Sequence, residues 1–286
     1  MFAFAFESLS TRWQILVDQP KMPDHVRVSI IKICEDFEKK YSRFLPESEI
    51  NQIGAGGEEK VKVSLDLAKM LNFGLVLRKL THGAFEPNIA AVLTSYGYDE
   101  KYSFQKKKLP MELGSFELSG PTLFKKGLVK LDLGAFGKGY LIDLIAVFLE
   151  KKGIKHFLIN GGGDIFATDK TDGSPWRVVI EHPLDPNLAI GQIDLKNRAL
   201  ATSSSQKRKF GEFRHLIDFR TKLPAESVLS VSVLASTSMV ADGVASAIFV
   251  GSASDWPRIV KSQGVEYLIL FPDLSFQRSE NFPQPY

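Results

Sequence analysis

The sequence predicts an α+β fold in which mainly antiparallel sheets pack against helices. Two observations lead to this class. Helical and strand-like segments are mixed along the 286 residues without a regular alternation of strand, helix and strand. The last third of the chain is mostly strand-like and divided by turn signals, as is typical of antiparallel pairing. No linker, internal repeat or low-complexity segment interrupts the chain, so residues 1–286 are interpreted as a single compact domain.

Composition places the chain among ordinary globular proteins. Hydrophobic residues make up 44% and charged residues 24%, which excludes disordered and fibrous classes. The 36 basic and 33 acidic side chains leave a net charge of +3, less than nucleic-acid binders usually carry. No apolar run approaches the ~18 residues that cross a bilayer, so no membrane span is expected. Cys34 is the only cysteine, and its apolar neighbours favour a buried structural thiol.

The first half of the chain predicts one strand and two helices. Residues 11–17 alternate apolar and mostly polar side chains, as in a strand. Apolar residues recur every three or four positions over 26–41, which predicts a helix that Pro46 keeps from continuing. Ser64 is placed to cap a second helix. Residues 98–127 are turn-rich, as expected of small strands and loops.

The second half opens with a dense succession of elements. A strand is expected over 128–133, a glycine-rich turn over 134–139 and an amphipathic helix over 140–152, which Gly153 ends. A strand over 155–159 follows. The elements expected after it are strands at 176–181, 189–195, 199–203, 214–218 and 228–235, a small-residue helix at 237–250, and a last strand at 267–271.

Two glycine-rich turns are candidates for a ligand site. The first, D-L-G-A-F-G-K-G-Y at 132–140, opens a helix, and a helix N-terminus favours anions such as phosphate. Its spacing matches neither the phosphate-binding loop of nucleoside triphosphatases nor the dinucleotide fingerprint, and glycines that merely turn the chain explain it equally well. The second, N-G-G-G-D at 160–164, follows the next strand. Both turns are therefore expected at one edge, around a shared pocket.

Two later segments carry side chains suited to catalysis. Asp242 and Ser246 lie four residues apart on the predicted helix, so their oxygens share one face and suit Mg²⁺. Taken alone, a close-packed helix with one satisfied aspartate explains them better. His215, in R-H-L-I-D-F-R-T at 214–221, could serve as a general base near neutral pH. A hairpin with polar surface residues explains that segment equally well.

The order of these motifs is more specific than any one of them. The chain carries S-R-F at 42–44 and G-A-F-E-P at 83–87, followed by the two glycine-rich turns, A-T-S at 201–203, H-L-I-D-F-R-T and A-D-G-V-A-S. In this order the chain resembles the ApbE family, the FAD:protein FMN transferases, from about residue 9 to residue 271. The resemblance implies an ApbE-like, T-fold-like domain. It also implies a Mg²⁺-dependent enzyme that moves FMN from its substrate FAD to a threonine hydroxyl of an acceptor protein and releases AMP.

The resemblance assigns roles to individual residues. It implies FAD contacts for Leu9, Ala84, Phe85, Glu86, Asp132, Lys138 and Ile217. It implies that a metal ion is held by the carbonyl groups of Ala135 and Ala245, the carboxylate of Asp242 and the hydroxyl of Ser246. His215 would lie at the flavin and assist the acceptor hydroxyl, so His215 and Asp242 form the expected catalytic pair. The chain departs from the family pattern where Leu9-Ser10-Thr11 replaces M-G-T, Glu86 replaces Asp, and Ser246 replaces Thr.

Two other functions would use the same residues. A Mg²⁺-dependent FAD pyrophosphatase would replace the threonine hydroxyl with water, and a non-catalytic protein would bind FAD for storage or delivery. The expected partners are FAD and an acceptor protein, without nucleic acid. The sequence shows no signal peptide and no lipid-anchoring cysteine, which predicts a cytoplasmic location, with a periplasmic one as the alternative if a leader has been removed.

Overall fold

The computed structural model describes residues 1–286 apart from 56, 58, 100–102, 104, 106, 110, 111, 205–208, 211, 212 and 215. His215, the expected general base, lies outside the described residues, and its role stays a prediction.

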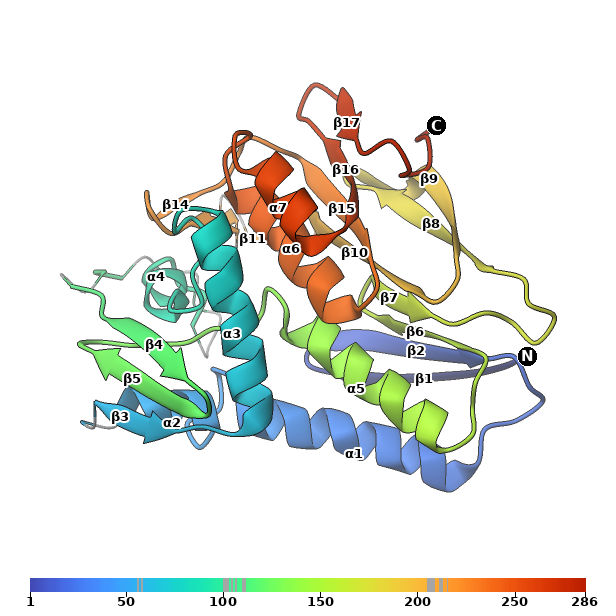
Figure 1. The fold of residues 1–286 in the computed structure, drawn as a ribbon, viewed down its shortest axis with the longest axis horizontal. Coiled ribbons are helices and arrows are strands. Elements are labelled where there is room, and N and C mark those ends of the chain that lie inside the picture. Colours follow the sequence, from blue (N-terminus) through green and yellow to red (C-terminus); the bar gives the residue numbers. More distant parts are fainter. Residues whose placement is uncertain are drawn as a thin grey trace.

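Within the described residues, an eight-stranded antiparallel sheet runs through the centre of the molecule (Figure 1). In spatial order its strands are β1 (Phe2–Ser8), β2 (Thr11–Val17), β6 (Phe157–Gly161), β7 (Asp164–Ala167), β10 (Arg198–Ser204), β15 (Ser230–Ala235), β16 (Glu266–Leu270) and β17 (Phe276–Arg278). The N-terminal hairpin pairs with β6 from the middle of the chain. Distant parts of the sequence therefore share one hydrogen-bonded sheet.

Helices cover one face of this sheet. They are α1 (Asp24–Tyr41), α5 (Gly137–Lys151) and α6 (Ser238–Val250), with α3 (Leu65–Leu80) and α7 (Trp256–Gln263) packed against α6. The main hydrophobic core fills the space between the sheet and these helices. Ile159 of β6 faces this core, whereas its neighbour Leu158 faces the opposite side, because successive side chains of a strand alternate between faces.

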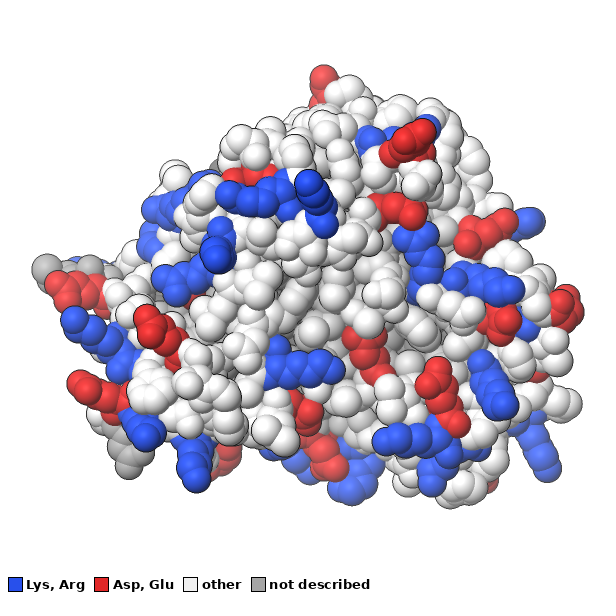
Figure 2. All heavy atoms as spheres, in the orientation of Figure 1, with Lys and Arg blue, Asp and Glu red and all other residues white. Residues whose placement is uncertain are grey.

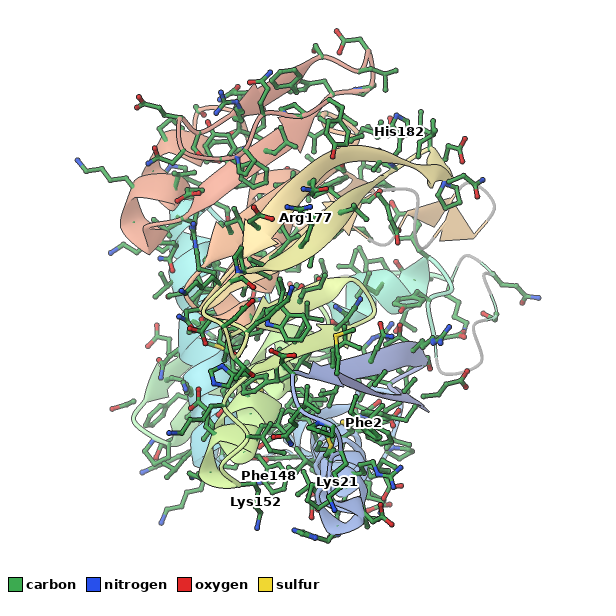
Figure 3. All side chains as sticks on the ribbon, turned by 90° about the vertical axis from the view of Figure 1, so that its right-hand side faces the viewer. Phe2, Lys21, Phe148, Lys152, Arg177 and His182 are labelled. Carbon is green, nitrogen blue, oxygen red and sulfur yellow. The ribbon has the colours of Figure 1, made fainter. Side chains whose placement is uncertain are left out.

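The opposite face is covered by a long hairpin formed by β8 (Trp176–His182) and β9 (Asp185–Leu195). A second apolar cluster joins this hairpin to the sheet. In Figure 3, Arg177 and His182 mark the hairpin, and Phe148 and Lys152 mark the C-terminal end of α5.

Smaller elements surround these layers. They are α2 (Glu49–Ala55), α4 (Ala90–Ser95), the antiparallel strands β3 (Lys60–Lys62), β5 (Thr122–Lys126) and β4 (Ser115–Ser119), and the short pairs β11 (Lys209–Phe210) with β12 (Phe213–Arg214) and β13 (Ile217–Asp218) with β14 (Leu223–Pro224). The sequence pattern did not predict the strands β1, β3, β7, β11, β14 and β17 or the helices α2, α4 and α7.

Most helix boundaries follow from local chemistry. In α1 the buried side chains recur every three or four residues, from Val26 to Tyr41, as the sequence predicts. Ser64 Oγ accepts a hydrogen bond from the Leu67 N–H at 3.3 Å and caps α3. Gly153 follows α5 with φ of +79°, a left-handed conformation that favours glycine at a helix end. Cys34 is fully buried in α1, as predicted.

Residues 128–133 do not form the predicted strand. Their backbone groups pair with loops instead: the Ala90 N–H donates to the Lys130 carbonyl at 3.1 Å, and the Asp132 N–H donates to the Pro87 carbonyl at 2.8 Å. The Lys130 N–H donates to the side chain of Asn88 at 2.6 Å. The mixture of apolar and charged side chains in this segment is typical of a strand, but among the described residues no strand pairs with it. The predicted strand at 214–218 is likewise divided between β12 and β13.

Charged side chains of both signs are interspersed over the face in Figure 2, without a broad single-sign patch. None of the helices among the described residues is long and apolar enough to cross a membrane.

Candidate functional site

A cavity of about 960 Å³ opens where α5, α6, β10 and several loops meet. Its lining includes ten residues that the sequence associates with FAD or a metal: Leu9, Ala84, Phe85, Glu86, Asp132, Ala135, Lys138, Ile217, Asp242 and Ser246. Ala245 is fully buried and does not belong to the lining. Gly134 and Gly162 also line the cavity, so the two glycine-rich turns face one pocket, as the sequence predicts.

A buried charged cluster lies at one side of the cavity. Lys138, in the first turn of α5, forms a close ion pair with Asp164, and its Nζ lies 3.9 Å from Oδ2 of Asp242. The side chains of Lys138, Asp164 and Asp242 are only 15%, 6% and 8% exposed. The Gly139 N–H donates to Asp242 Oδ2 at 3.1 Å. The N-terminus of α5 therefore approaches a carboxylate of α6, an arrangement that the positive end of the helix dipole favours.

Two contacts fix α5 against α6. A Cβ on Gly139 would lie 2.2 Å from the Ser238 carbonyl oxygen, so only glycine allows the two backbones to approach this closely. Asp143 accepts hydrogen bonds from the N–H groups of Ser238 at 2.7 Å and Met239 at 3.0 Å. Burial raises the pKa of the Asp143 carboxyl, against the effect of these two donors. The contacts fix the spacing of the α5 and α6 backbones that carry Lys138 and Asp242.

The oxygen atoms beside this cluster fit a hard divalent cation. Asp242 and Ser246 lie on the same face of α6, and both line the cavity together with Ala135. Ser246 Oγ lies 3.0 Å from Ser203 Oγ, and either hydroxyl can donate. A carboxylate, a hydroxyl and backbone carbonyl groups are ligands that suit Mg²⁺, which retains water or phosphate oxygens as its other ligands. Among the described residues, no three His, Cys, Asp or Glu side chains cluster as a ready-made metal site.

Arg43 lines another part of the cavity. Its Nε lies 2.5 Å from Oδ2 of Asp132, and its Nη2 donates to the Tyr98 carbonyl at 2.7 Å. The guanidinium carbon lies 4.2 Å from the ring centroid of Phe44 and 4.7 Å from that of Tyr98. All four residues line the cavity. The guanidinium therefore holds together a carboxylate and two aromatic rings that a flat ligand could contact.

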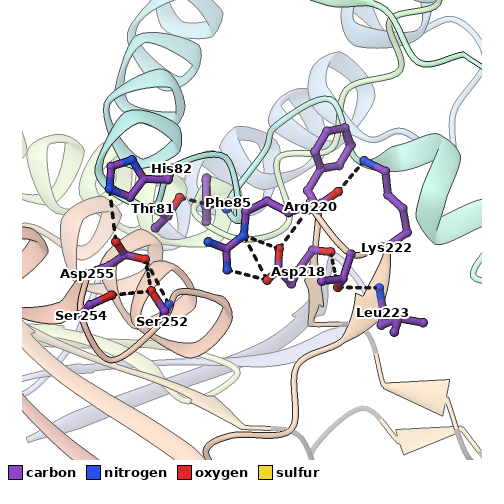
Figure 4. Close-up of polar contacts among 12 residues, drawn as sticks. Thr81, His82, Phe85, Asp218, Arg220, Lys222, Leu223, Ser252, Ser254 and Asp255 are labelled. Carbon is purple, nitrogen blue, oxygen red and sulfur yellow. Dashed lines mark hydrogen bonds and ion pairs between the residues drawn. The ribbon is translucent and has the colours of Figure 1, made fainter.

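The segment with Ala84 and Phe85 is held by a turn from the last third of the chain (Figure 4). The Phe219 N–H donates to the Ala84 carbonyl at 2.9 Å, and the Phe85 N–H donates to Thr81 Oγ1 at 3.0 Å. Arg220 pairs with Asp218 at 2.7 Å in the same turn. This docking brings Ile217 and Phe85 to one cavity although more than a hundred residues separate them in the sequence.

Glu86 lies at the cavity wall with its carboxylate already bonded. Its Oε2 lies 2.8 Å from Nε of Arg78, and its Oε1 accepts a hydrogen bond from the Asn88 N–H at 3.0 Å. Burial raises the pKa of Glu86 despite these partners. Leu9, also in the lining, sits in the β1–β2 turn with φ of +49°. Any FAD contact of these two residues stays a prediction.

Residues 9–269 match the sequence profile of the ApbE family. The chain belongs to the ApbE family. The FAD:protein FMN transferase of Rhodobacter capsulatus is 30% identical over 241 residues, which cover 78% of this chain and 46% of that protein. The FAD:protein FMN transferase of Haemophilus influenzae is 29% identical over 269 residues, which cover 85% of this chain and 78% of that protein. The chain thus spans about half the length of the first relative and more than three quarters of the second.

Solved structures of ApbE proteins share the fold. The ApbE protein from Thermotoga maritima superimposes with a TM-score of 0.85 at 25% identity, over 98% of this chain and 97% of that one. Flavin transferase ApbE from Vibrio cholerae superimposes with a TM-score of 0.82 at 22% identity, over 97% of this chain and 96% of that one. The predicted α+β, ApbE-like fold is confirmed.

The sequence interpretation missed three residues at this ApbE-family site. Asp164 ends the N-G-G-G-D segment, whose glycines predict a turn, and a carboxylate after three glycines is the signal that marks it. Arg43 belongs to the S-R-F segment, but its partner Asp132 lies 89 residues later. Tyr98 falls in a stretch interpreted only as strands and loops, and nothing in its local sequence marks it.

Proposed function

We propose that this ApbE-family protein is an FAD:protein FMN transferase, which moves FMN from FAD to a threonine hydroxyl of an acceptor protein and releases AMP. The observation that carries the proposal is the single cavity, which collects ten of the residues expected at such a site. Its volume, about 960 Å³, is at the upper end of the usual range for small-molecule sites, consistent with a ligand as large as a dinucleotide.

The proposed metal is Mg²⁺, held by Asp242, Ser246 and the carbonyl group of Ala135. Ala245, which the family resemblance also implies, is buried inside α6 away from the cavity and is left out of the proposed ligands. When bound, the metal would neutralise charge on the phosphoryl oxygens of FAD. Lys138 would present its ammonium group to the pyrophosphate from the first turn of α5, where backbone N–H groups also favour an anion. Asp132, held by Arg43, would accept hydrogen bonds from hydroxyl or amine groups of FAD.

In the proposed step, the threonine oxygen of the acceptor forms a bond to the phosphorus of the FMN half. The bond from that phosphorus to the bridging oxygen of AMP breaks, and AMP leaves with the electron pair. The threonine proton passes to a base, for which His215 is the proposed residue. Ala84, Phe85 and Ile217 would contact the flavin and keep water from the reacting phosphorus.

The proposal is tested by incubating the purified protein with FAD and Mg²⁺, with and without an acceptor domain that has an exposed threonine. AMP and the intact mass of the acceptor are measured in the same samples. We expect AMP together with an acceptor that is heavier by the mass of one FMN less one water, as phosphodiester formation requires. AMP with free FMN and an unmodified acceptor would identify an FAD pyrophosphatase instead. FAD binding without AMP, with an acceptor that a related transferase modifies, would identify a non-catalytic binder.

A further inference from the structure

Lys138 lies between two buried carboxylates that belong to different elements. Its ammonium is in direct contact with Asp164 of β7 and is 3.9 Å from Asp242 of α6. The Lys138 ammonium therefore lies close to two carboxylates that are both largely shielded from water. In such surroundings a carboxylate that loses a nearby cation raises the free energy of the folded protein. A small shift of the ammonium from one carboxylate towards the other therefore changes the environment of both.

We propose that Asp164 is a positioning residue that holds Lys138 away from Asp242 and so keeps the Asp242 carboxylate available to a divalent cation. The inference rests on the proposed function, in which Asp242 is the charged metal ligand. Without a charge at position 164, the ammonium would need to move only about 1 Å to reach hydrogen-bond distance of Asp242. It would then compete directly with the metal for that oxygen.

The turn that carries Asp164 is built to hold it in place. Gly162 and Gly163 have φ of +70° and +103°, values that favour glycine, and the Gly163 N–H donates to Asn160 Oδ1 at 2.8 Å. A Cβ on Gly162 would lie 2.4 Å from Thr11 Oγ1, so the turn is also packed tightly against β2. Asp164 pairs with Gly161 at the start of β7. The backbone at Asp164 is therefore held in place and its side chain is short, whereas Lys138 has a long and flexible side chain.

The contact with Asp164 also orients the ammonium group of Lys138. A lysine ammonium has three N–H groups, so the contact with Asp164 does not by itself prevent Lys138 from donating to an anion in the cavity. Asp242 and Ser246 would then hold the metal, while the Lys138 ammonium would supply a second positive charge to the pyrophosphate.

The inference is tested by Mn²⁺ binding, with Mn²⁺ as a paramagnetic probe for the Mg²⁺ site. Free Mn²⁺ is followed by electron paramagnetic resonance without FAD, so the readout does not depend on turnover. The variants are Asp164→Asn, Lys138→Met and the double variant, with Asp194→Asn as the control. Asp194 is an exposed carboxylate on β9 that pairs with Arg177 and does not line the cavity. Circular dichroism and the melting temperature verify that each variant is folded.

We expect Asp164→Asn to raise the Kd for Mn²⁺ by at least about tenfold, which corresponds to about 1.4 kcal/mol. Lys138→Met should bind Mn²⁺ at least as tightly as the wild type. The Asp164→Asn change should have no further effect in the Lys138→Met background, since the competing ammonium is gone. Asp194→Asn should leave the Kd unchanged.

Two results would overturn the inference alone. One is wild-type affinity in Asp164→Asn. The other is an equal loss of affinity with and without Lys138, which would make Asp164 a metal ligand or a structural residue. A wild-type protein that binds no Mn²⁺, with or without FAD, would overturn the metal site of the proposed function and this inference with it.

Discussion

Arg43 and Asp132 form an ion pair with 2.5 Å between Nε and Oδ2, although 89 residues separate them in the sequence. Their side chains are only 7% and 13% exposed. The pair joins the loop after α1 to the glycine-rich turn before α5, and Asp132 Oδ1 also accepts from the Gly134 N–H at 2.6 Å. The shape of the proposed FAD site thus depends on a contact between two distant loops.

Arg43→Met should weaken both folding and FAD binding. It leaves the Asp132 carboxylate buried without its cation, which costs about 3 kcal/mol. Urea unfolding measures the loss of stability, and quenching of flavin fluorescence measures the Kd for FAD. Asp132→Asn should lower stability less in the Arg43→Met background than in the wild type, because the two side chains interact directly. Strictly additive effects would contradict a coupling between them.

Gly139→Ala should disturb the contact between α5 and α6. The new Cβ would meet the Ser238 carbonyl oxygen at 2.2 Å, and overpacking of this kind costs about 1–3 kcal/mol. Urea unfolding measures the loss. Gly57→Ala is the matched control, because a Cβ there meets nothing within 4 Å, and it should change stability by less than about 0.5 kcal/mol. Equal stability of the two variants would show that the helices can separate without cost.

Asp242→Ala should abolish Mg²⁺-dependent release of AMP from FAD, because it removes the charged ligand proposed for the metal. AMP is quantified by chromatography over a range of Mg²⁺ concentrations. The exposed Asp194→Asn variant is the control and should keep wild-type activity. Full activity of folded Asp242→Ala would refute the proposed metal site.

Glu86 should make stability depend on pH. Burial raises the pKa of Glu86 in the folded protein above its ordinary value of 4.5. At a pH between these two pKa values, the folded protein carries a proton on Glu86 that the unfolded chain has lost. The stability of the wild type relative to Glu86→Gln should therefore rise as the pH falls through the raised pKa, and become constant below about 4.5. Urea unfolding from pH 7 to pH 4 measures it. A difference that is constant with pH, or that falls, would contradict the raised pKa.

Cys34 should be inert in the folded protein. Burial raises the pKa of its thiol to about 12, so the reactive thiolate is scarce as well as inaccessible. Reaction with Ellman's reagent at pH 8 should be more than about 100-fold slower in buffer than in 8 M urea, since the reagent must wait for an opening of α1. Fast labelling of the native protein would show that α1 opens easily.

The sequence by itself determined the parts of this protein that depend on neighbouring residues. The helix at α1 follows from apolar side chains every three or four residues, and the caps of α3 and α5 follow from Ser64 and Gly153. The order of short motifs was sufficient to predict the family and ten residues that line the cavity. Each of these motifs combines a turn with the side chain that the turn presents.

Only the tertiary structure decided what depends on distant partners. Residues 128–133 have the composition of a strand, but their hydrogen bonds go to the loop at 87–90. The pairing of Lys138 with Asp164 and Asp242, and of Arg43 with Asp132, joins elements far apart in the sequence. Hydrogen bonds and buried ion pairs act over a few ångströms, so they depend on which segments the fold brings together and leave no regular pattern in the local sequence.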